Sequence, residues 1–216
     1  RETLHQAKET LKEKEREYLD VLLKETQRLS GIVNKILNFS QIEKGKRKYN
    51  LAQINLNEIV DEVLTTYSHH LENKDFEYHI NLDHELPYIK ADREAVTDAM
   101  VNLIDNSVKY SHDKKYIEIK TGRSSGYVYL EVQDQGQGIS EKEMKHIFDK
   151  FYRVTSSNLT PKTKGSGLGL SIVKHIVDAH NGYVRVHSRK GKGSRFVLYF
   201  PLNNGYQRQV SESNIK

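Results

Sequence analysis

Hydrophobic positions in the first part of the chain follow a helical repeat. Two mostly apolar rows, three positions apart, each recur every seven residues: Leu22, Leu29 and Ile36, and Leu19, Thr26 and Val33. Such a seam is typical of helices that pack in a coiled coil or bundle. Further apolar residues beside the seam, Ile32, Leu37, Phe39 and Ile42, widen the stripe and favour a four-helix bundle.

Residues 1–45 are therefore predicted to be helical, in one of two arrangements. The segment Lys12–Glu17 is entirely charged and could form a turn between an end of one helix at 1–11 and an antiparallel helix at 16–44. One long helix is the alternative. The first piece is too short to close a bundle, so we expect a second copy of the chain to complete it.

A second domain is expected from Ile54, after a linker at 46–53, because a glycine followed by basic residues marks a helix end. Asn55 or Asn57 could cap its first helix, Asp92 could cap the next, and Ser140-Glu-Lys-Glu143 fits a capping box. Alternation predicts strands at 77–82, 116–120, 127–132, 183–187 and 195–200, and helical periodicity predicts main helices ending near 67, 110 and 179.

This order of elements favours an α+β sandwich over a parallel doubly wound sheet. The domain is expected to span residues 54–203, with a polar, mobile loop at 155–165 and a loose tail at 204–216.

Composition narrows the classes of function. The 216 residues carry a net charge of +5 with both signs interspersed, which gives no reason to expect nucleic-acid binding. There is no cysteine, hence no disulfide framework and no thiolate metal site. No apolar run approaches the roughly 18 residues of a membrane span, and no signal peptide is found. Because the chain begins with Arg1 rather than methionine, we expect it to be a piece of a longer protein.

Two asparagines lie four residues apart on the helix predicted around residues 92–110. Asn102 and Asn106 therefore share a helix face, next to apolar neighbours. Buried amides are costly unless they meet a polar partner, and a metal-bound polyphosphate is such a partner. Taken alone, hydrogen bonds within the core explain the pair equally well.

Three glycine-rich segments follow. Asp134-Gln-Gly-Gln-Gly-Ile139 comes directly after a predicted strand, and its carboxylate could accept a hydrogen bond from an amine such as that of adenine. Gly165-Ser-Gly-Leu-Gly-Leu170 directly precedes a predicted helix, whose N-terminal amides suit a phosphate. Gly191-Lys-Gly-Ser-Arg-Phe196 lies between two strands. Singly, each is also explained by an ordinary turn or by close helix packing, and none fits a P-loop or dinucleotide fingerprint.

In order and spacing, these motifs resemble the N, G1, F, G2 and G3 boxes of sensor histidine kinases. The F segment is Phe148–Arg153, in which aromatic rings could cover a base while Arg153 or Lys150 reaches a phosphate. The resemblance covers residues 54–203 and extends to 1–45, which are similar to part of a dimerisation and phosphotransfer hairpin. It implies the two-layer α/β sandwich of the histidine kinase and gyrase-type ATPases, preceded by an α-helical hairpin.

The resemblance also implies roles for individual residues. Asn106 would coordinate Mg²⁺ bridging the phosphates of ATP, Asn102 would support it, and Arg153 would lie near the γ-phosphate. Asp134 would bind the adenine amine, and residues 141–165 would form a lid over ATP. The other implied nucleotide-binding residues are Lys109, Tyr110, Gly136, Gly138, Lys150, Gly165, Gly167, Leu168, Gly169 and Ser194.

Two departures from related patterns shape the expected activity. Hydrolysing relatives carry a glutamate where this chain has Asn102, and an amide cannot accept the proton of an attacking water. None of the ten histidines lies in the family's phosphoacceptor box; His5, for example, is followed by Gln6 and by no nearby proline. We therefore expect transfer to a histidine upstream of Arg1, and no autophosphorylation of these residues by themselves.

The expected protein is a protein-histidine kinase of a two-component system. It would pass phosphate to an aspartate on a response-regulator receiver domain and dimerise through the hairpin, and the chain would be the cytoplasmic part of a membrane-anchored sensor. A serine-kinase or anti-sigma relative would lack the hairpin. A non-enzymatic nucleotide-sensing module would lack one of the residues that bind the metal or the phosphates.

Overall fold

The computed structural model describes residues 13–45, 47–111, 114–153 and 166–202, and the chain divides into two compact units between residues 47 and 48. The first unit contains one long helix, α2 (Glu13–Glu43). The turn considered at residues 12–17 is wrong for residues 13–17, which begin this helix. Glutamate, lysine and arginine are good helix formers, so a charged run need not interrupt a helix. Residues 1–12 lie outside the described part.

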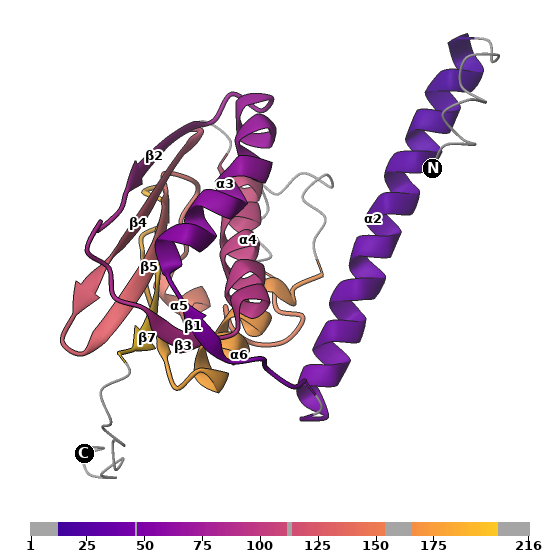
Figure 1. Ribbon diagram of the computed structural model, residues 1–216. Helices are drawn as coiled ribbons and strands as arrows, with labels where there is room; N and C mark the ends of the chain where they lie inside the picture. Colours follow the sequence, from indigo (N-terminus) through magenta and orange to yellow (C-terminus); the bar gives the residue numbers. More distant parts are fainter. Residues whose placement is uncertain (1–12, 46, 112–113, 154–165, 203–216) are drawn as a thin grey trace. The chain divides into compact units, whose positions relative to one another are not determined.

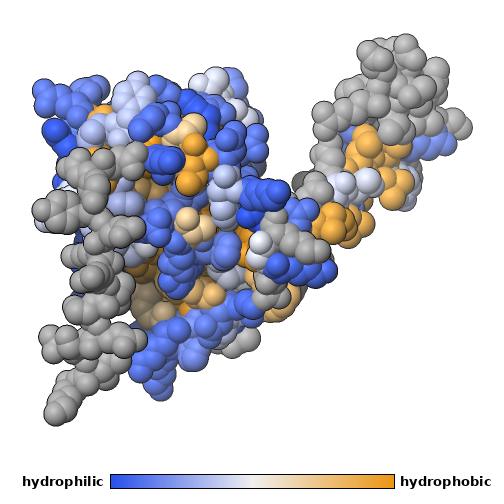
Figure 2. Space-filling model, turned by 60° about the horizontal axis from the view of Figure 1, so that its bottom comes forward, coloured by the Kyte–Doolittle hydropathy of each residue, from blue (hydrophilic) through white to orange (hydrophobic). Residues whose placement is uncertain are grey.

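Helix α2 exposes the apolar seam predicted from the heptad repeat. Seven large apolar side chains along it are about half to two-thirds exposed: Tyr18, Val21, Leu22, Leu29, Val33, Ile36 and Leu37. Figure 2 shows hydrophobic side chains at the surface of this helix. A helix with such a stripe is suited to packing against other helices.

The second unit is built on a five-stranded mixed sheet with the order β2-β4-β5-β7-β6. The strands are β2 (Glu77–Asn81), β4 (Tyr116–Ser124), β5 (Tyr127–Asp134), β6 (Tyr183–Ser188) and β7 (Ser194–Pro201). Only β2 runs parallel to its neighbour; the remaining pairs are antiparallel. The β4–β5 turn is made by Ser125 and Gly126, both at positive φ, as the twist of a tight hairpin favours.

Three main helices cover one face of this sheet (Figure 1). They are α3 (Leu56–Glu72), α4 (Arg93–Tyr110) and α6 (Gly169–Ala179), and a short helix, α5 (Glu141–Met144), lies between β5 and α6 in the chain. The α+β two-layer sandwich is therefore confirmed. Its core joins alternate side chains of the sheet, such as Ile119, Leu130 and Leu198, to apolar stripes of the helices, such as Met100 and Ile176.

Local signals at the helix starts were predicted correctly. Asn55 caps α3 by accepting from the N–H of Asn57, and Asp92 caps α4 by accepting from the N–H of Ala95. The capping box of Ser140 opens α5. A second, two-stranded sheet of β1 (Ala52–Ile54) and β3 (Ile89–Ala91) was not predicted. It ties the start of the second unit to the residues that precede α4.

We expect the shared core to dominate the stability of this unit. Leu130 on β5 is fully buried, whereas Ile80 on the edge strand β2 is 45% exposed. Leu130→Ala should lower the free energy of unfolding by about 2–5 kcal/mol, because it leaves a cavity. The matched change Ile80→Ala should cost about 1 kcal/mol or less. Denaturant unfolding followed by circular dichroism measures both; equal losses would contradict the described sandwich.

Candidate functional site

One open pocket lies beside the end of β5 and the start of β7. It has an empty volume of about 610 Å³, part of it open to solvent, which is within the range of about 300–1,000 Å³ typical of small-molecule sites. Its lining brings together six residues predicted from the sequence: Asn106, Tyr110, Asp134, Gly138, Arg153 and Ser194. They come from α4, from β5 and the segment after it, from the segment after α5, and from β7.

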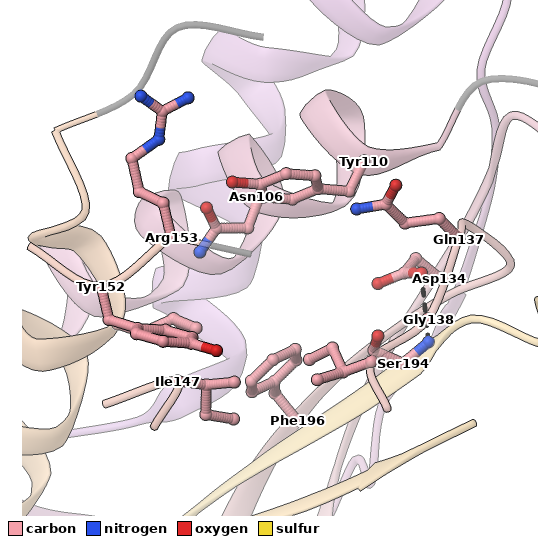
Figure 3. A pocket seen from close by; sticks show the side chains of 12 residues that line it. Asn106, Tyr110, Asp134, Gln137, Gly138, Ile147, Tyr152, Arg153, Ser194 and Phe196 are labelled. Carbon is pink, nitrogen blue, oxygen red and sulfur yellow. Dashed lines mark hydrogen bonds between the residues drawn. The ribbon is translucent and has the colours of Figure 1, made fainter. Parts of the chain in front are cut away.

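The polar groups of this pocket are separated. Figure 3 shows Asp134 and Ser194 toward one end, and Asn106 and Arg153 toward the other. Apolar side chains, among them Ile147 and Phe196, lie between and below them. A ligand with an amine at one end and an anionic group at the other would therefore find matching chemistry along this pocket.

Asp134 is a buried carboxylate that is only partly compensated. Its Oδ1 accepts from the N–H groups of Gly136, at 2.9 Å, and Ser194, at 3.1 Å. The hydroxyl of Ser107 donates to Oδ2 over 3.4 Å, a long contact that leaves Oδ2 with accepting capacity. Burial raises the pKa of Asp134, while the bonds from Gly136, Ser194 and Ser107 act in the opposite direction. The carboxylate is held in place by the backbone, with one oxygen available to a donor in the pocket.

Two glycines after Asp134 allow close approaches of the backbone. Gly138 has a φ of +63°, and a Cβ there would collide with the carbonyl oxygen of Arg189 in the β6–β7 turn. A Cβ on Gly136 would lie 2.5 Å from the carbonyl oxygen of Tyr110, at the end of α4. The close approach of Gly136 to Tyr110 allows this segment to pack against α4. That the two glycines also bind the nucleotide stays a prediction.

The asparagine pair faces the start of α6. A Cβ on Gly169, the first residue of that helix, would lie 3.1 Å from Oδ1 of Asn102 and 3.9 Å from Nδ2 of Asn106. Asn102 is 9% exposed and donates to the carbonyl oxygen of Asp98, so its oxygen is the end directed at α6. At the described N-terminus of α6, Leu168 makes no side-chain cap. The first amides of this helix therefore lack the usual capping acceptor and can bind an anion.

The remaining predicted residues in the described part of the chain do not line this pocket. Lys109 donates to the hydroxyl of Tyr110 over 2.9 Å and so helps to orient a ring that does line it. Lys150 is exposed, Leu168 is fully buried, and Gly167 packs on the backbone of Phe151. Gly165 and most of the expected lid lie outside the described residues.

Half of the lining was not among the predicted residues. These are Gln137, Ile139, Ile147, Tyr152, Leu170 and Phe196. Most of them lie within two positions of a predicted residue, and Phe196 is two residues beyond Ser194 on the same face of β7. Applying the period of two along β7 would have found Phe196, since the apolar side of a pocket is built from neighbours of its polar groups.

Comparison with known proteins places this architecture in a family. The model of the histidine kinase-, DNA gyrase B- and HSP90-like ATPases matches residues 91–204, and that of the His Kinase A (phospho-acceptor) domain matches residues 1–45. The sensor protein RprX of Bacteroides fragilis is 34% identical over 184 residues, 84% of this chain and 35% of RprX.

Solved structures agree. The ShkA full-length structure in complex with AMPPNP has a TM-score of 0.76 and 25% identity, covering 89% of this chain and 40% of that one. The histidine kinase AdeS of Acinetobacter baumannii shares the fold with a TM-score of 0.71 and 24% identity, covering 87% and 86% of the two chains.

The chain belongs to the histidine kinase-, DNA gyrase B- and HSP90-like ATPase family, and within it to the sensor histidine kinases of two-component systems. It spans less than half of the length of the curated relatives it matches, for example 35% of RprX. None of the helices in the described part of the chain combines the length and the apolar character that crossing a membrane requires.

Replacing the buried carboxylate of Asp134 tests how its ionisation affects the stability of the fold. Because burial raises the pKa of Asp134 in the folded protein, the folded state holds that proton more tightly than the unfolded state does. Stability therefore falls as pH rises through the interval between the two pKa values, from about 4 upward. Asp134→Asn keeps an oxygen for Gly136 and Ser194 and removes this loss.

We expect the unfolding temperature of Asp134→Asn at pH 7 to equal or exceed that of the wild type, with the difference shrinking as pH falls toward 4. Thermal unfolding at several pH values measures it, with the exposed Asp61→Asn as the matched control. The contrary result would be an unfolding temperature of the variant that falls below that of the wild type at pH 7 but not at pH 4. It would show that the ionised carboxylate stabilises the fold.

Proposed function

We propose that this chain is the Mg-ATP-binding module of a protein-histidine kinase, with ATP bound in the pocket described above. The observation that carries the proposal is the arrangement of its polar ends. Asp134 offers a carboxylate oxygen at one end, suited to the amine of adenine, and Asn106 with the uncapped start of α6 lies at the other, suited to phosphates. The AMPPNP complex of ShkA supports this assignment.

The residues present fit a magnesium ion held mainly by its nucleotide. Mg²⁺ prefers oxygen ligands and is commonly bound by one or two protein groups together with phosphates and water. The amide oxygen of Asn106 can be such a ligand. The described residues contain no cluster of three histidine, cysteine or acidic side chains that could hold a metal without a nucleotide. When bound, the ion neutralises charge on the transferred phosphoryl group.

The chain's own groups position the nucleotide. Asp134 and the apolar lining fix the base, while the first amides of α6 and Arg153 hold the phosphates and exclude alternative placements. Asn102 donates to Asp98 and presents only an amide, so it cannot accept a proton from water. This favours transfer to a nucleophile over hydrolysis, and we assign that nucleophile to a histidine outside these 216 residues.

The partners follow from the same family. The match of residues 1–45 to the phospho-acceptor domain and the exposed apolar seam of α2 support packing of this helix in a hairpin and a homodimer. Phosphate would then pass from the histidine to an aspartate of a response-regulator receiver domain. We also propose that the parent protein is a membrane-anchored sensor and that this chain is its cytoplasmic part.

Removing the proposed metal ligand, Asn106, should abolish the contribution of Mg²⁺ to ATP affinity. Asn106→Ala should weaken ATP binding in the presence of Mg²⁺ by about ten- to a hundredfold, the equivalent of one charged polar contact, and have much less effect when Mg²⁺ is chelated. Isothermal titration calorimetry measures both conditions. Asn81→Ala, at an exposed position of β2, is the matched control. Equal weakening with and without Mg²⁺ would remove Asn106 from the metal site.

The transfer reaction is tested with γ-labelled ATP on this chain and on one extended upstream. We expect acid-labile, alkali-stable label on the extended chain alone, as a phosphohistidine requires. Nucleotide binding with no label on either chain would favour a nucleotide-sensing module instead. Label on the present chain would place the acceptor among its ten histidines.

A further inference from the structure

The residues that lead into the ATP-binding unit are fixed to the ends of two helices. The N–H of Asn50 donates to Oδ2 of Asp92 over 2.7 Å, while Oδ1 of the same carboxylate caps α4 through Ala95. Tyr49 packs edge-on against the ring of His180, with centroids 5.1 Å apart. These side-chain contacts hold two linker residues that precede the β1–β3 pairing, in which Ala52 lies opposite Ala91. We call Tyr49, Asn50, Asp92 and His180 the linker clasp.

His180 joins the two helices within this clasp. It directly follows α6 and is 4% exposed. Its Nδ1 lies 2.6 Å from the carbonyl oxygen of Ile176, which can only accept, so Nδ1 carries the proton. Its Nε2 is then free to accept the N–H of Asp92 at 2.9 Å. The end of α6 is thus bonded to the residue that caps α4.

The opposite ends of the same helices form the proposed nucleotide site. Gly169 begins α6 against Asn102 and Asn106 in the second half of α4, so the helices run antiparallel with the clasp at one end and the site at the other. Eleven residues of α6 separate them, roughly 16 Å at 1.5 Å per residue. Because both helices are rigid, a ligand that draws their site ends together also acts on their clasped ends.

We propose that the linker clasp couples the linker to the nucleotide site. Tyr49 and Asn50 are positioning residues: they hold the start of α4 and the end of α6, and so favour the spacing at which Asn106 and the amides of α6 bind phosphate. By linkage, a bound nucleotide stabilises the clasp by the same factor as the clasp strengthens nucleotide binding. The coupling rests on the proposed function, since it requires a nucleotide in this pocket.

Asp92→Asn separates the clasp from the helix cap. Asparagine caps helices as well as aspartate, so its one oxygen can serve Ala95 while its NH₂ group faces the N–H of Asn50. Tyr49→Ala removes the other half of the clasp without touching α4. Asp61→Asn, on the exposed surface of α3, is the matched control for the charge change.

The test compares amide exchange and affinity for Mg-ADP in these four proteins. In the wild type, we expect saturating Mg-ADP to slow exchange of the Asn50 amide about fivefold or more, within the usual range of coupling between sites. Both clasp variants should bind Mg-ADP more weakly by a similar factor, with unfolding temperatures close to the wild type. The control should match the wild type in both measurements.

Two results would overturn the coupling. If Mg-ADP binds the wild type and both clasp variants equally, and exchange at Asn50 does not respond to it, the linker contact is only a structural tie, although the proposed nucleotide site stands. If Mg-ADP binds none of the four proteins, the proposed function fails and the coupling fails with it.

Discussion

The close antiparallel approach of α4 and α6 is the constraint on which the site depends. At one end a glycine favours it, because a Cβ at Gly169 would lie only 3.1 Å from Oδ1 of Asn102. At the other it is held by the bond between Asp92 and His180. Between these points, buried side chains of both helices pack on the sheet, so the core and the contacts at the helix ends set their spacing together. The first amides of α6 and Asn106 are thereby placed at one pocket without any flexible segment having to bring them together.

The same core places a poorly compensated charge at the other end of the pocket. Asp134 ends β5, and its Oδ1 accepts from the N–H of Ser194 at the start of β7; burial there raises the pKa of Asp134. Because burial disfavours the charged form, we expect a carboxylate here to stabilise the fold less than an amide of the same shape would. Under the proposed function its presence serves recognition, since a carboxylate accepts a hydrogen bond from an amine that an amide nitrogen would repel.

Much of this could be predicted from local patterns, because caps, hairpin turns and apolar periods are properties of neighbouring residues. The caps at Asn55 and Asp92 and the turn at Ser125 are examples. The β1–β3 sheet could not, since its three-residue strands carry too little alternation and the paired residues lie 35–39 positions apart along the chain. The packing of Gly136 on Tyr110 depends on how β5 and α4 meet, which no local motif contains.

The most direct test of the account is the relative affinity for ATP and ITP in the presence of Mg²⁺. Inosine differs from adenosine at the base by a carbonyl in place of the amine, so it would set an acceptor against the carboxylate of Asp134. The account predicts that ATP binds at least about tenfold more tightly than ITP, because an unpaired buried polar group costs roughly 1–3 kcal/mol. Equal affinities would contradict it, since the base would then not be bound at Asp134.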